Sequence, residues 1–278
     1  MVATPIGNLT NLSLRALHML ALADTITYED TRHTRQLLGA FGIEPHALLA
    51  VHQHNEAEAA QAVVARLAQG ERVAFVSDAG TPAVSDPGAR LVAAARAAGH
   101  ATVPLPGASS VTAALSVAGA VAASGDEKGF VFAGFMPSRA AERRAAIEAL
   151  AAEPRAVVLL EAPHRIAALA EALAALGDRC VTLARELTKQ FEQIHTLPAQ
   201  ALPAWLAADT HRQRGEFALV LHPAPQAAAP RAVDEKRLLR LLMAELPLKT
   251  AARLTAEATG GHRNALYAHG LQIKQEGA

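Results

Sequence analysis

The sequence predicts an α/β protein, with two tandem α/β domains of mainly parallel or mixed sheets, a cleft between them, and a small helical C-terminal appendage. Strand-like and helix-like segments alternate along most of the chain, as they do where helices connect parallel strands. A proline- and alanine-rich stretch then precedes three short helical patterns. The 278 residues, 51% of them hydrophobic and 19% charged, suffice for two modest cores and are too well balanced for disorder.

The first predicted domain, residues 1–108, alternates helices with short strands. Apolar residues at helical spacing predict the helices, β-branched or apolar runs predict the strands, and Gly42, Gly70 and Gly99 follow three of the helices. The expected helices are 13–22, 34–41, 55–69 and 89–98, and the expected strands are 25–28, 47–51, 73–76 and 102–105.

The second predicted domain, residues 109–222, shares this architecture but not its residues. Its expected strands are 130–133, 156–160, 181–184 and 217–221, and its expected helices are 140–151 and 165–176. Residues 223–231 are predicted to be a linker, because they hold three prolines and a run of alanine. The basic appendage, 232–278, has helical patterns at 234–245, 249–259 and 264–275.

Charge and cysteine content narrow the class of protein. Lys plus Arg and Asp plus Glu are equal at 26 each, but from Arg231 onward eight basic residues face five acidic ones. This excess fits contact with a polyanion, and an ordinary solvated surface is the alternative. Cys180 is the single cysteine, which suits a reducing cytoplasm, and it is expected to be a small core residue.

Neither a secretory signal nor a membrane span is expected. No basic leader precedes an apolar stretch at the start of the sequence. The longest uncharged stretch, 101–125, is rich in Ser, Gly and Ala and opens with two prolines, unlike a helix that faces lipid.

Residues 75–88 are the most informative segment, because a strand-like run there enters a loop with two Asp, two Gly and two Pro. The glycines permit turns or close ligand approach, the prolines stiffen the path, and Asp78 and Asp86 can accept hydrogen bonds. Open α/β sheets bind ligands in loops at the carboxyl ends of their strands. Two consecutive turns with capping Asp residues are the alternative.

Two common phosphate-binding motifs are absent from the sequence. No Gly-x-Gly-x-x-Gly follows a strand, and there is no Walker-type Gly-Lys-Ser/Thr, so the usual backbone cradles for pyrophosphate or triphosphate are missing. A nucleotide-like cofactor without phosphates needs neither cradle. S-adenosylmethionine is such a molecule.

Several segments together resemble one family. They are Val-Ala-Thr-Pro-Ile-Gly-Asn-Leu at 2–9, Tyr-Glu-Asp-Thr-Arg-His-Thr at 28–34, His-Gln-His-Asn-Glu at 52–56, Ser-Asp-Ala-Gly-Thr-Pro at 77–82, Pro-Gly-Ala-Ser-Ser at 106–110, Glu-Ala-Pro-His-Arg at 161–165 and shorter matches at 184–189, 215–217, 246–249 and 263–267. The chain resembles the tetrapyrrole-methylase-like class of S-adenosylmethionine methyltransferases and, within it, the family of bacterial small-subunit ribosomal RNA methyltransferases. Members normally carry a few more apolar residues before 2–9, so we expect the first strand to be clipped.

The resemblance implies a cofactor folded into the cleft, a cytoplasmic homodimer, and 2′-O-methylation of a cytidine in the decoding region of 16S rRNA within the 30S subunit. The cofactor contacts it implies are Pro5, Asp78, Ala79, Gly80, Thr81, Ser109, Ser110, Ala133, Gly134, Phe135, Glu161, Ala162 and Ala184. Two local alternatives stay open. Residues 106–110 could simply turn a strand into a helix capped by Ser109, and residues 133–135 could be ordinary core packing.

Methyl transfer to a ribose hydroxyl needs alignment and a base, because the protonated hydroxyl is a poor nucleophile. The candidate bases are Asp30, Glu161, Glu186 and His54. Asp30 could instead cap the following helix. Likewise, the segment with His54 could be a strand end followed by a helix with Glu56 in its first turn.

RNA binding has to be local, because the whole chain is not basic. The expected RNA contacts are Arg32, Arg35, Arg165, Lys249, Arg253 and Arg263. Arg165 could bind a phosphate or a structural carboxylate, and Arg139, Arg143 and Arg144 fit an ordinary solvated helix face. Aromatic residues make up only 4% of the chain, so recognition is expected to rest on the shape of a folded RNA surface.

Three alternative functions remain open at this point. A small-molecule methyltransferase acting on a corrin or porphyrin would share the architecture but would not need the basic tail. A metal hydrolase using Asp30, His33, His52 and His54 lacks a recognised ligand motif, and no metal is expected. The third is a non-catalytic ribosome-binding module.

Overall fold

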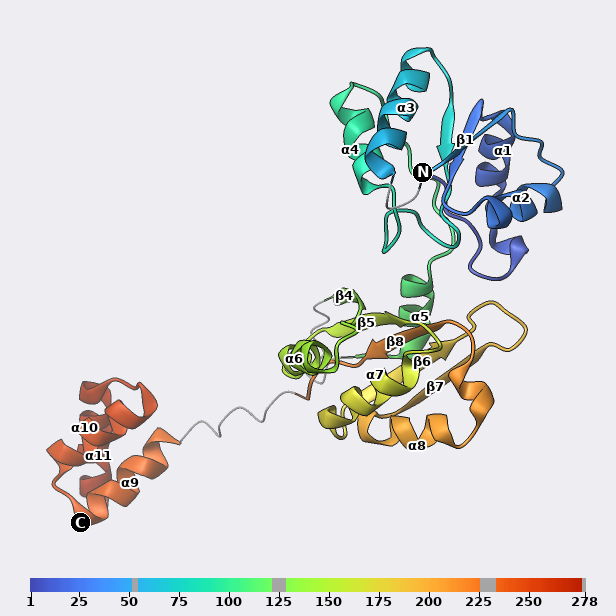
Figure 1. Ribbon diagram of the computed structural model, residues 1–278. Helices are drawn as coiled ribbons and strands as arrows, with labels where there is room; N and C mark the ends of the chain where they lie inside the picture. The colour runs from blue at the N-terminus through green and yellow to red at the C-terminus, as the bar shows by residue number, and fades with distance from the viewer. Residues whose placement is uncertain (52–54, 122–128, 226–233, 277–278) are drawn as a thin grey trace. The chain divides into compact units, whose positions relative to one another are not determined.

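A computed structural model describes residues 1–51, 55–121, 129–225 and 234–276 (Figure 1). By their internal contacts the residues form two units, Met1–Ala224 and Pro225–Ala278, and each is described by itself. Most of the predicted linker at 223–231 lies outside the described residues. The boundary predicted between the two α/β domains falls inside the larger unit and stays a prediction.

The first sheet of the larger unit is parallel, in the order β2–β1–β3. Its strands are β1 (Thr25–Tyr28), β2 (Ala47–Ala50) and β3 (Val73–Phe75). Val2 extends the sheet through isolated bridges to Val76 and Leu105. The strand predicted at 102–105 is wrong, because only Leu105 of this segment forms a bridge. Pro104 and Pro106 lack the backbone N–H that a longer ladder needs.

Helices cover both faces of this sheet. They are α1 (Leu14–Leu22), which follows the 3-10 helix η1 (Leu9–Asn11), α2 (Thr31–Ala40), α3 (Glu56–Ala68) and α4 (Ala89–Ala97). Leu20 and Leu38 pack with Ile26 in one cluster, and Val63 and Leu91 pack with Phe75 in another. Burial on both faces is what parallel sheets require.

The second sheet is mixed, in the order β4–β5–β8–β6–β7. Its strands are β4 (Phe130–Phe135), β5 (Ala156–Glu161), β6 (Cys180–Arg185), β7 (Gln193–Pro198) and β8 (Phe217–Leu221). β4 and β5 are parallel, whereas β8 lies antiparallel between β5 and β6, and β7 is antiparallel to β6. The predicted strands in this half are therefore confirmed, and β7 is one that the sequence patterns did not predict.

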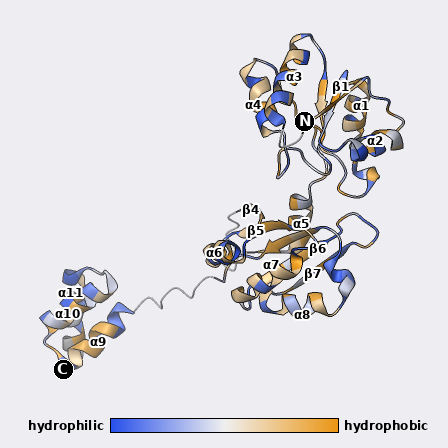
Figure 2. Cartoon of the chain, in the orientation of Figure 1, coloured by the Kyte–Doolittle hydropathy of each residue, from blue (hydrophilic) through white to orange (hydrophobic). Residues whose placement is uncertain are grey.

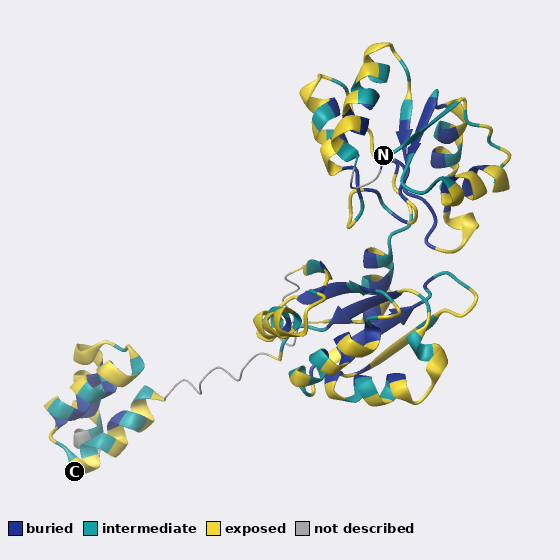
Figure 3. Ribbon diagram, in the orientation of Figure 1, coloured by how far each residue is buried: buried dark blue, intermediate teal, exposed yellow. Residues whose placement is uncertain are grey.

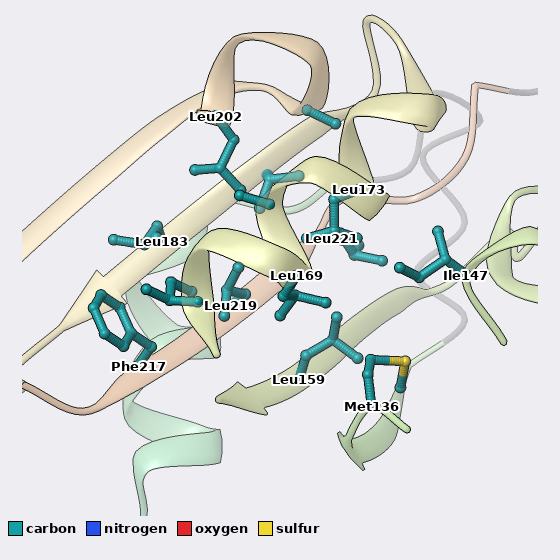
Figure 4. Close-up of a cluster of buried hydrophobic side chains, with 14 of the residues drawn as sticks. Met136, Ile147, Leu159, Leu169, Leu173, Leu183, Leu202, Phe217, Leu219 and Leu221 are labelled. Atoms are coloured by element: carbon teal, nitrogen blue, oxygen red, sulfur yellow. The ribbon is translucent and has the colours of Figure 1, made fainter. Parts of the chain in front are cut away.

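Alternate residues of the second sheet face two different cores, as the period of a strand requires. Leu159 and Leu219 belong to the cluster drawn in Figure 4, with Leu169 of the helix above them. Val158 and Val220 point to the other face, where they join a second cluster. The central strands of this sheet, β5, β8 and β6, are mostly hydrophobic (Figure 2) and buried (Figure 3), and they form the main core of the larger unit.

The helices around the second sheet are partly unpredicted. They are α5 (Ser110–Ala118), α6 (Ala140–Leu150), α7 (Ile166–Leu173), α8 (Leu202–Ala207) and the 3-10 helices η2 (Ala174–Leu176), η3 (Ala199–Ala201) and η4 (Thr210–Gln213). The patterns missed α5 and α8.

The prediction that Cys180 is a core residue is wrong, because it is exposed where β6 begins opposite Pro198.

The smaller unit is a helical bundle with its own core. Its helices are α9 (Glu235–Glu245), α10 (Leu248–Thr259) and α11 (Arg263–Glu276), close to the predicted ranges. Leu239, Ala251 and Leu266 are buried together. Asp234 caps α9 by accepting the backbone N–H groups of its first turn, and Gly260 ends α10 in a left-handed conformation. None of the helices described is long and apolar enough to cross a membrane.

Arg179 joins the end of α6 to the end of β8 and should be important for stability. It is 3% exposed, and its guanidinium donates to the carbonyl of Leu150 at 2.6 Å and to that of His222 at 2.7 Å. Burial lowers its pKa.

We predict that Arg179→Met lowers the free energy of unfolding by about 3 kcal/mol, because it leaves buried carbonyls without donors. Chemical denaturation measures this change. The control is Arg144→Met on the exposed face of α6, which should shift the value by less than about 0.5 kcal/mol. Equal unfolding midpoints for both variants would contradict the structural role of Arg179.

Candidate functional site

A cavity of about 340 Å³ in the larger unit lies where the loops after several strands meet. Its walls include Ile6, Val84 of the loop after β3, Leu160 of β5 and Leu187 after β6. Phe135, the last residue of β4, is 51% exposed and also borders it. Most of this lining is apolar with a few polar groups, which is typical of small-molecule sites at strand ends.

The predicted cofactor contacts divide between the cavity wall and the segments beside it. Those that border the cavity are Ala79, Ser110, Phe135, Glu161, Ala162 and Ala184. Those that do not border it lie within two residues of a wall residue in the chain, and they are Pro5, Asp78, Gly80, Thr81, Ser109, Ala133 and Gly134. Residues 106–110 lead into α5 with Ser109 directly before it, as the alternative interpretation of this segment expected. The side chain of Ser109 makes no capping hydrogen bond, so the expected cap is wrong.

The loop after β3 is held against the start of the chain. The N–H of Thr4 donates to the carbonyl of Gly80 at 2.9 Å, and the N–H of Gly80 donates back at 3.1 Å. Gly80 has a φ of +81°, where glycine is favoured. Ala83 and Ser85 adopt φ of 67° and 69° without being glycine, a strain of order 1 kcal/mol each. Such strain is common beside ligand sites.

Glu161 ends β5 and is 3% exposed. Its Oε1 accepts the N–H of Ala162 at 2.9 Å and lies 3.1 Å from Nε of Arg165. Arg165 also donates to the carbonyl of Met136. Arg165 was expected to bind either a phosphate or a structural carboxylate, and the structure shows it paired with the carboxylate of Glu161. Oε2 of Glu161 is buried without a hydrogen-bond partner in the described residues, and Glu161 borders the cavity.

Asp30 is a helix cap rather than a free base. Its side chain accepts the N–H of Arg32 at 2.7 Å at the start of α2, and Nη2 of Arg32 lies 3.3 Å from its other oxygen. These hydrogen bonds lower the pKa of Asp30. The capping interpretation is thus the one that the structure shows. The N–H of Asp30 in turn donates to Oδ1 of Asp78 at 2.9 Å.

Glu186 is held by neighbouring donors and does not border the cavity. Its Oε1 accepts Nζ of Lys189 and the N–H of Glu216, both at 2.9 Å. Burial raises its pKa, but the hydrogen bonds from Lys189 and Glu216 outweigh burial and lower it. A carboxylate with its acceptor site filled in this way is a poor proton acceptor.

His54 lies outside the described residues, as does His52. The nearby Glu56 stands in the first turn of α3, as predicted, where its Oε1 accepts the N–H of Gly88 at 3.0 Å. Among the residues that the structure describes, no group of three or more His, Cys, Asp or Glu is arranged to hold a metal ion.

Two carboxyl groups, one directly after β1 and one in the loop after β3, have raised pKa values, and the sequence patterns did not single out the first of them, Glu29. Burial, with added repulsion from Asp78, Asp86 and Asp30, raises the pKa of Glu29 to about 7. Burial and the charge of Asp78 raise that of Asp86 to about 6, and Asp86 borders the cavity. The sequence does place Glu29 and Asp30 side by side at the end of a predicted strand. It cannot tell which of these two carboxyl groups caps the following helix.

The predicted RNA contacts are mostly exposed. Arg32 and Arg35 lie on the outer surface of α2, and Lys249 and Arg263 are exposed on the smaller unit. Arg253 pairs with Glu257 at 2.8 Å.

A further hollow of about 360 Å³ lies among α1, β3, α3 and α4, and none of the predicted site residues borders it.

Comparison with known proteins defines the class of this chain. Residues 1–203 match the family model of tetrapyrrole (corrin/porphyrin) methylases, and residues 229–274 match that of the RsmI C-terminal HTH domain. The chain therefore belongs to the tetrapyrrole methylases, a class of methyltransferases, as its sequence predicted, and within that class to the ribosomal RNA small subunit methyltransferase I family.

The relatives behind this assignment align along almost the whole chain. The ribosomal RNA small subunit methyltransferase I of Pseudomonas aeruginosa is 46% identical over 278 residues, covering 98% of this chain and 95% of the relative. That of Escherichia coli O157:H7 is 46% identical over 275 residues, covering 98% and 93%.

Solved structures support the fold. A uroporphyrin-III-C-methyltransferase from Thermus thermophilus aligns with a TM-score of 0.55 at 21% identity, over 80% of this chain and 92% of its own. A diphthine synthase aligns with a TM-score of 0.58 at 16% identity, over 80% and 88%. Another uroporphyrin-III C-methyltransferase structure, with a TM-score of 0.52 at 17% identity over 79% and 94%, is complexed with S-adenyl homocysteine. These likenesses confirm the α/β fold class.

Gly215 offers a test of the packing around Glu186. Its φ is +87°, and a Cβ there would lie 2.5 Å from Glu186 atoms that hydrogen bonds hold in place. We predict that Gly215→Ala destabilises the protein by about 2 to 4 kcal/mol, from left-handed strain plus crowding.

The matched control is Gly99→Ala. Its φ of +82° is similar, but no described atom lies within 4 Å of the added Cβ, so the variant should lose only about 1 kcal/mol. Thermal and chemical unfolding measure both changes. The same loss in the two variants would show that Glu186 moves aside freely.

Proposed function

We propose that this protein transfers the methyl group of S-adenosylmethionine to the 2′-hydroxyl of a cytidine in the decoding region of 16S rRNA, within the 30S subunit. The observation that carries the proposal is the 46% identity over 98% of the chain to a ribosomal RNA small subunit methyltransferase I. The cavity at the strand ends supports it, because six of the predicted cofactor residues border that cavity.

The residues of the cavity fit a phosphate-free cationic cofactor. Its volume of about 340 Å³ is in the range of small-molecule sites. Glu161, Asp86 and Glu216 bring negative charge to its wall, and Oε2 of Glu161 is an unused acceptor in the described structure. Ala79, Ser110, Glu161, Ala162 and Ala184 would hold the cofactor.

The protein's part in the reaction is binding, orientation and exclusion of water. S-adenosylmethionine supplies an electrophilic methyl group, so no covalent intermediate with the protein is needed. Ile6, Leu187 and Phe135 provide apolar walls that exclude water. Glu161 is fixed by the N–H of Ala162 and by Arg165, so that its free oxygen has a defined direction.

The smaller unit would supply part of the rRNA contact. Residues 229–274 match an HTH domain, a type of domain that binds nucleic acids. Lys249 and Arg263 are exposed there and can neutralise phosphates. We further propose that the protein acts as a homodimer in the cytoplasm, as its resemblance to the family implies.

The tetrapyrrole alternative has weaker support. The structures that would suggest it are at most 21% identical and carry only the fold. It leaves the basic helical unit without a role. The non-catalytic alternative in turn leaves the cavity and the free acceptor of Glu161 without a role.

Transfer of tritium from labelled S-adenosylmethionine to purified 30S subunits tests the function. We predict that the label appears at one cytidine and resists alkaline hydrolysis, because a 2′-O-methyl group removes the hydroxyl that attacks the neighbouring phosphodiester. Label on a base would refute the 2′-O assignment. Label on a tetrapyrrole and none on 30S subunits would support the small-molecule alternative.

A second prediction concerns the cofactor. Glu161→Gln removes the buried negative charge but keeps the shape, so the dissociation constant for S-adenosylmethionine should rise about tenfold or more. Calorimetry measures the constant, and Glu44→Gln, at an exposed glutamate away from the cavity, is the control. Unchanged binding by the Glu161 variant would remove this residue from the cofactor site.

A further inference from the structure

The cavity at the strand ends has a buried floor and an exposed rim. Its floor includes Ile6, Leu187 and Phe217, each at most 9% exposed. On its rim two large apolar side chains stay open to solvent, because Phe135 is 51% exposed and Val84 is 37% exposed. Exposed apolar surface that borders a cavity is typical of a place where a ligand or partner makes contact. The rim therefore offers an apolar contact to a group that enters from outside.

A bulge in β4 turns Phe135 toward this cavity. Phe132 is paired with Val158 of β5, and Phe135 is paired with Leu160, which borders the cavity. Paired residues share a face of a sheet, as do residues two apart in one strand, so Phe132 and Phe135 lie on the same face. In a regular strand, residues three apart face opposite ways. The register shift between Phe132 and Gly134 adds the extra residue that puts Phe135 on the cavity face.

The bulge depends on a glycine. Gly134 has a φ of +66°, a conformation that favours glycine. Bulges are rare between parallel strands such as β4 and β5, and beside active sites they redirect a side chain. A Cβ on Gly134 would lie 3.7 Å from Oγ of Ser85, so the bulge approaches the loop that carries Val84. Distorted backbone thus presents both apolar side chains of the rim.

The nucleotide in the proposed reaction carries its base close to the reacting oxygen. The 2′-oxygen and the base are attached to neighbouring carbons of the ribose. When the 2′-hydroxyl reaches a methyl group held inside the cavity, the base therefore lies at the opening of the cavity. Proteins that bind unpaired RNA nucleotides commonly stack their bases on aromatic side chains.

We propose that Phe135 is the platform on which the base of the target nucleotide stacks. This inference rests on the proposed function and adds the residue that positions the nucleotide. Stacking tolerates any base, so Phe135 orients the nucleotide and does not select cytosine. Within the described ranges, only one of the exposed Phe and Tyr side chains borders this cavity, and it is Phe135 among Phe130, Phe135, Phe191 and Tyr267.

The position on the rim separates Phe135 from the residues that fit the cofactor. Glu161 and Ala184 are buried in the floor, so a ligand that contacts them is already inside the cavity. RNA arrives from solvent and meets the rim first, where half of the Phe135 surface is open. The resemblance to the family implied a cofactor contact for Phe135, and binding of S-adenosylmethionine decides between the two roles.

The test compares Phe135→Ala with Phe130→Ala. Phe130 is the matched control, because it is an exposed phenylalanine at the other end of β4 and does not border this cavity. Methyl transfer to 30S subunits is measured as kcat/KM. Phe135→Ala should lower kcat/KM by about tenfold or more, the effect of losing one stacked base. Phe130→Ala should match the wild type.

Two further substitutions separate stacking from apolar contact alone. Phe135→Tyr keeps the aromatic ring and should retain the wild-type kcat/KM. Phe135→Leu keeps an apolar side chain without a ring, so it should lose as much activity as Phe135→Ala. In calorimetry all of these variants should bind S-adenosylmethionine as tightly as the wild type. Their melting temperatures should stay close to that of the wild type, because the substituted side chains are exposed.

The outcomes distinguish this inference from the function on which it rests. Wild-type activity in Phe135→Ala or in Phe135→Leu overturns the stacking role and leaves the proposed function standing. Weaker binding of S-adenosylmethionine by Phe135→Ala overturns it and assigns the ring to the cofactor. A changed oligomeric state in sedimentation, or a lower melting temperature, overturns it and gives Phe135 a structural role. A wild-type protein that transfers no label to 30S subunits overturns the proposed function, and this inference with it.

Discussion

The reciprocal hydrogen bonds between Thr4 and Gly80 are the constraint on which the site depends. They fasten the loop after β3 to the first residues of the chain. Val2, before this contact, packs into the core of the first sheet, and Ile6, after it, packs with Val158 and Ala184 of the second sheet. One short segment therefore belongs to two cores. This arrangement brings Ile6 and the loop residue Ala79 to the wall of one cavity.

How far the sequence predicts the fold depends on the pattern that each element carries. β8, with five buried residues in a row, stands out as a strand, whereas β7 is an exposed edge strand with no clear alternation and was missed. α5 was missed because it lies in a small-residue stretch without charges to mark a face. The insertion of β8 between β5 and β6 is a matter of tertiary pairing, and no local pattern encodes it.

The site was predictable in position but not in the role of each side chain. Strand-end loops rich in Gly, Asp and Pro can be read from sequence, and several of the expected contacts do border the cavity. Roles depend on partners that are distant in the chain. Asp30 became a cap and Arg165 a partner of Glu161, while Glu29 gained its environment from Asp78, 49 positions away. Adjacent carboxylates are alike in sequence, and only the fold makes them different.

The same region holds several features that oppose folding. Ala83 and Ser85 have left-handed backbones, Oε2 of Glu161 is buried without a partner in the described structure, and Glu29 lies among other carboxyls. The strained backbones and the unpartnered oxygen each cost of order 1 kcal/mol. They persist because the large core of the second sheet, with Leu159, Leu183 and Leu219 fully buried, offsets them. Since a bound cationic ligand would offset the negative charge of Glu161 at the cavity wall, binding can recover part of this cost.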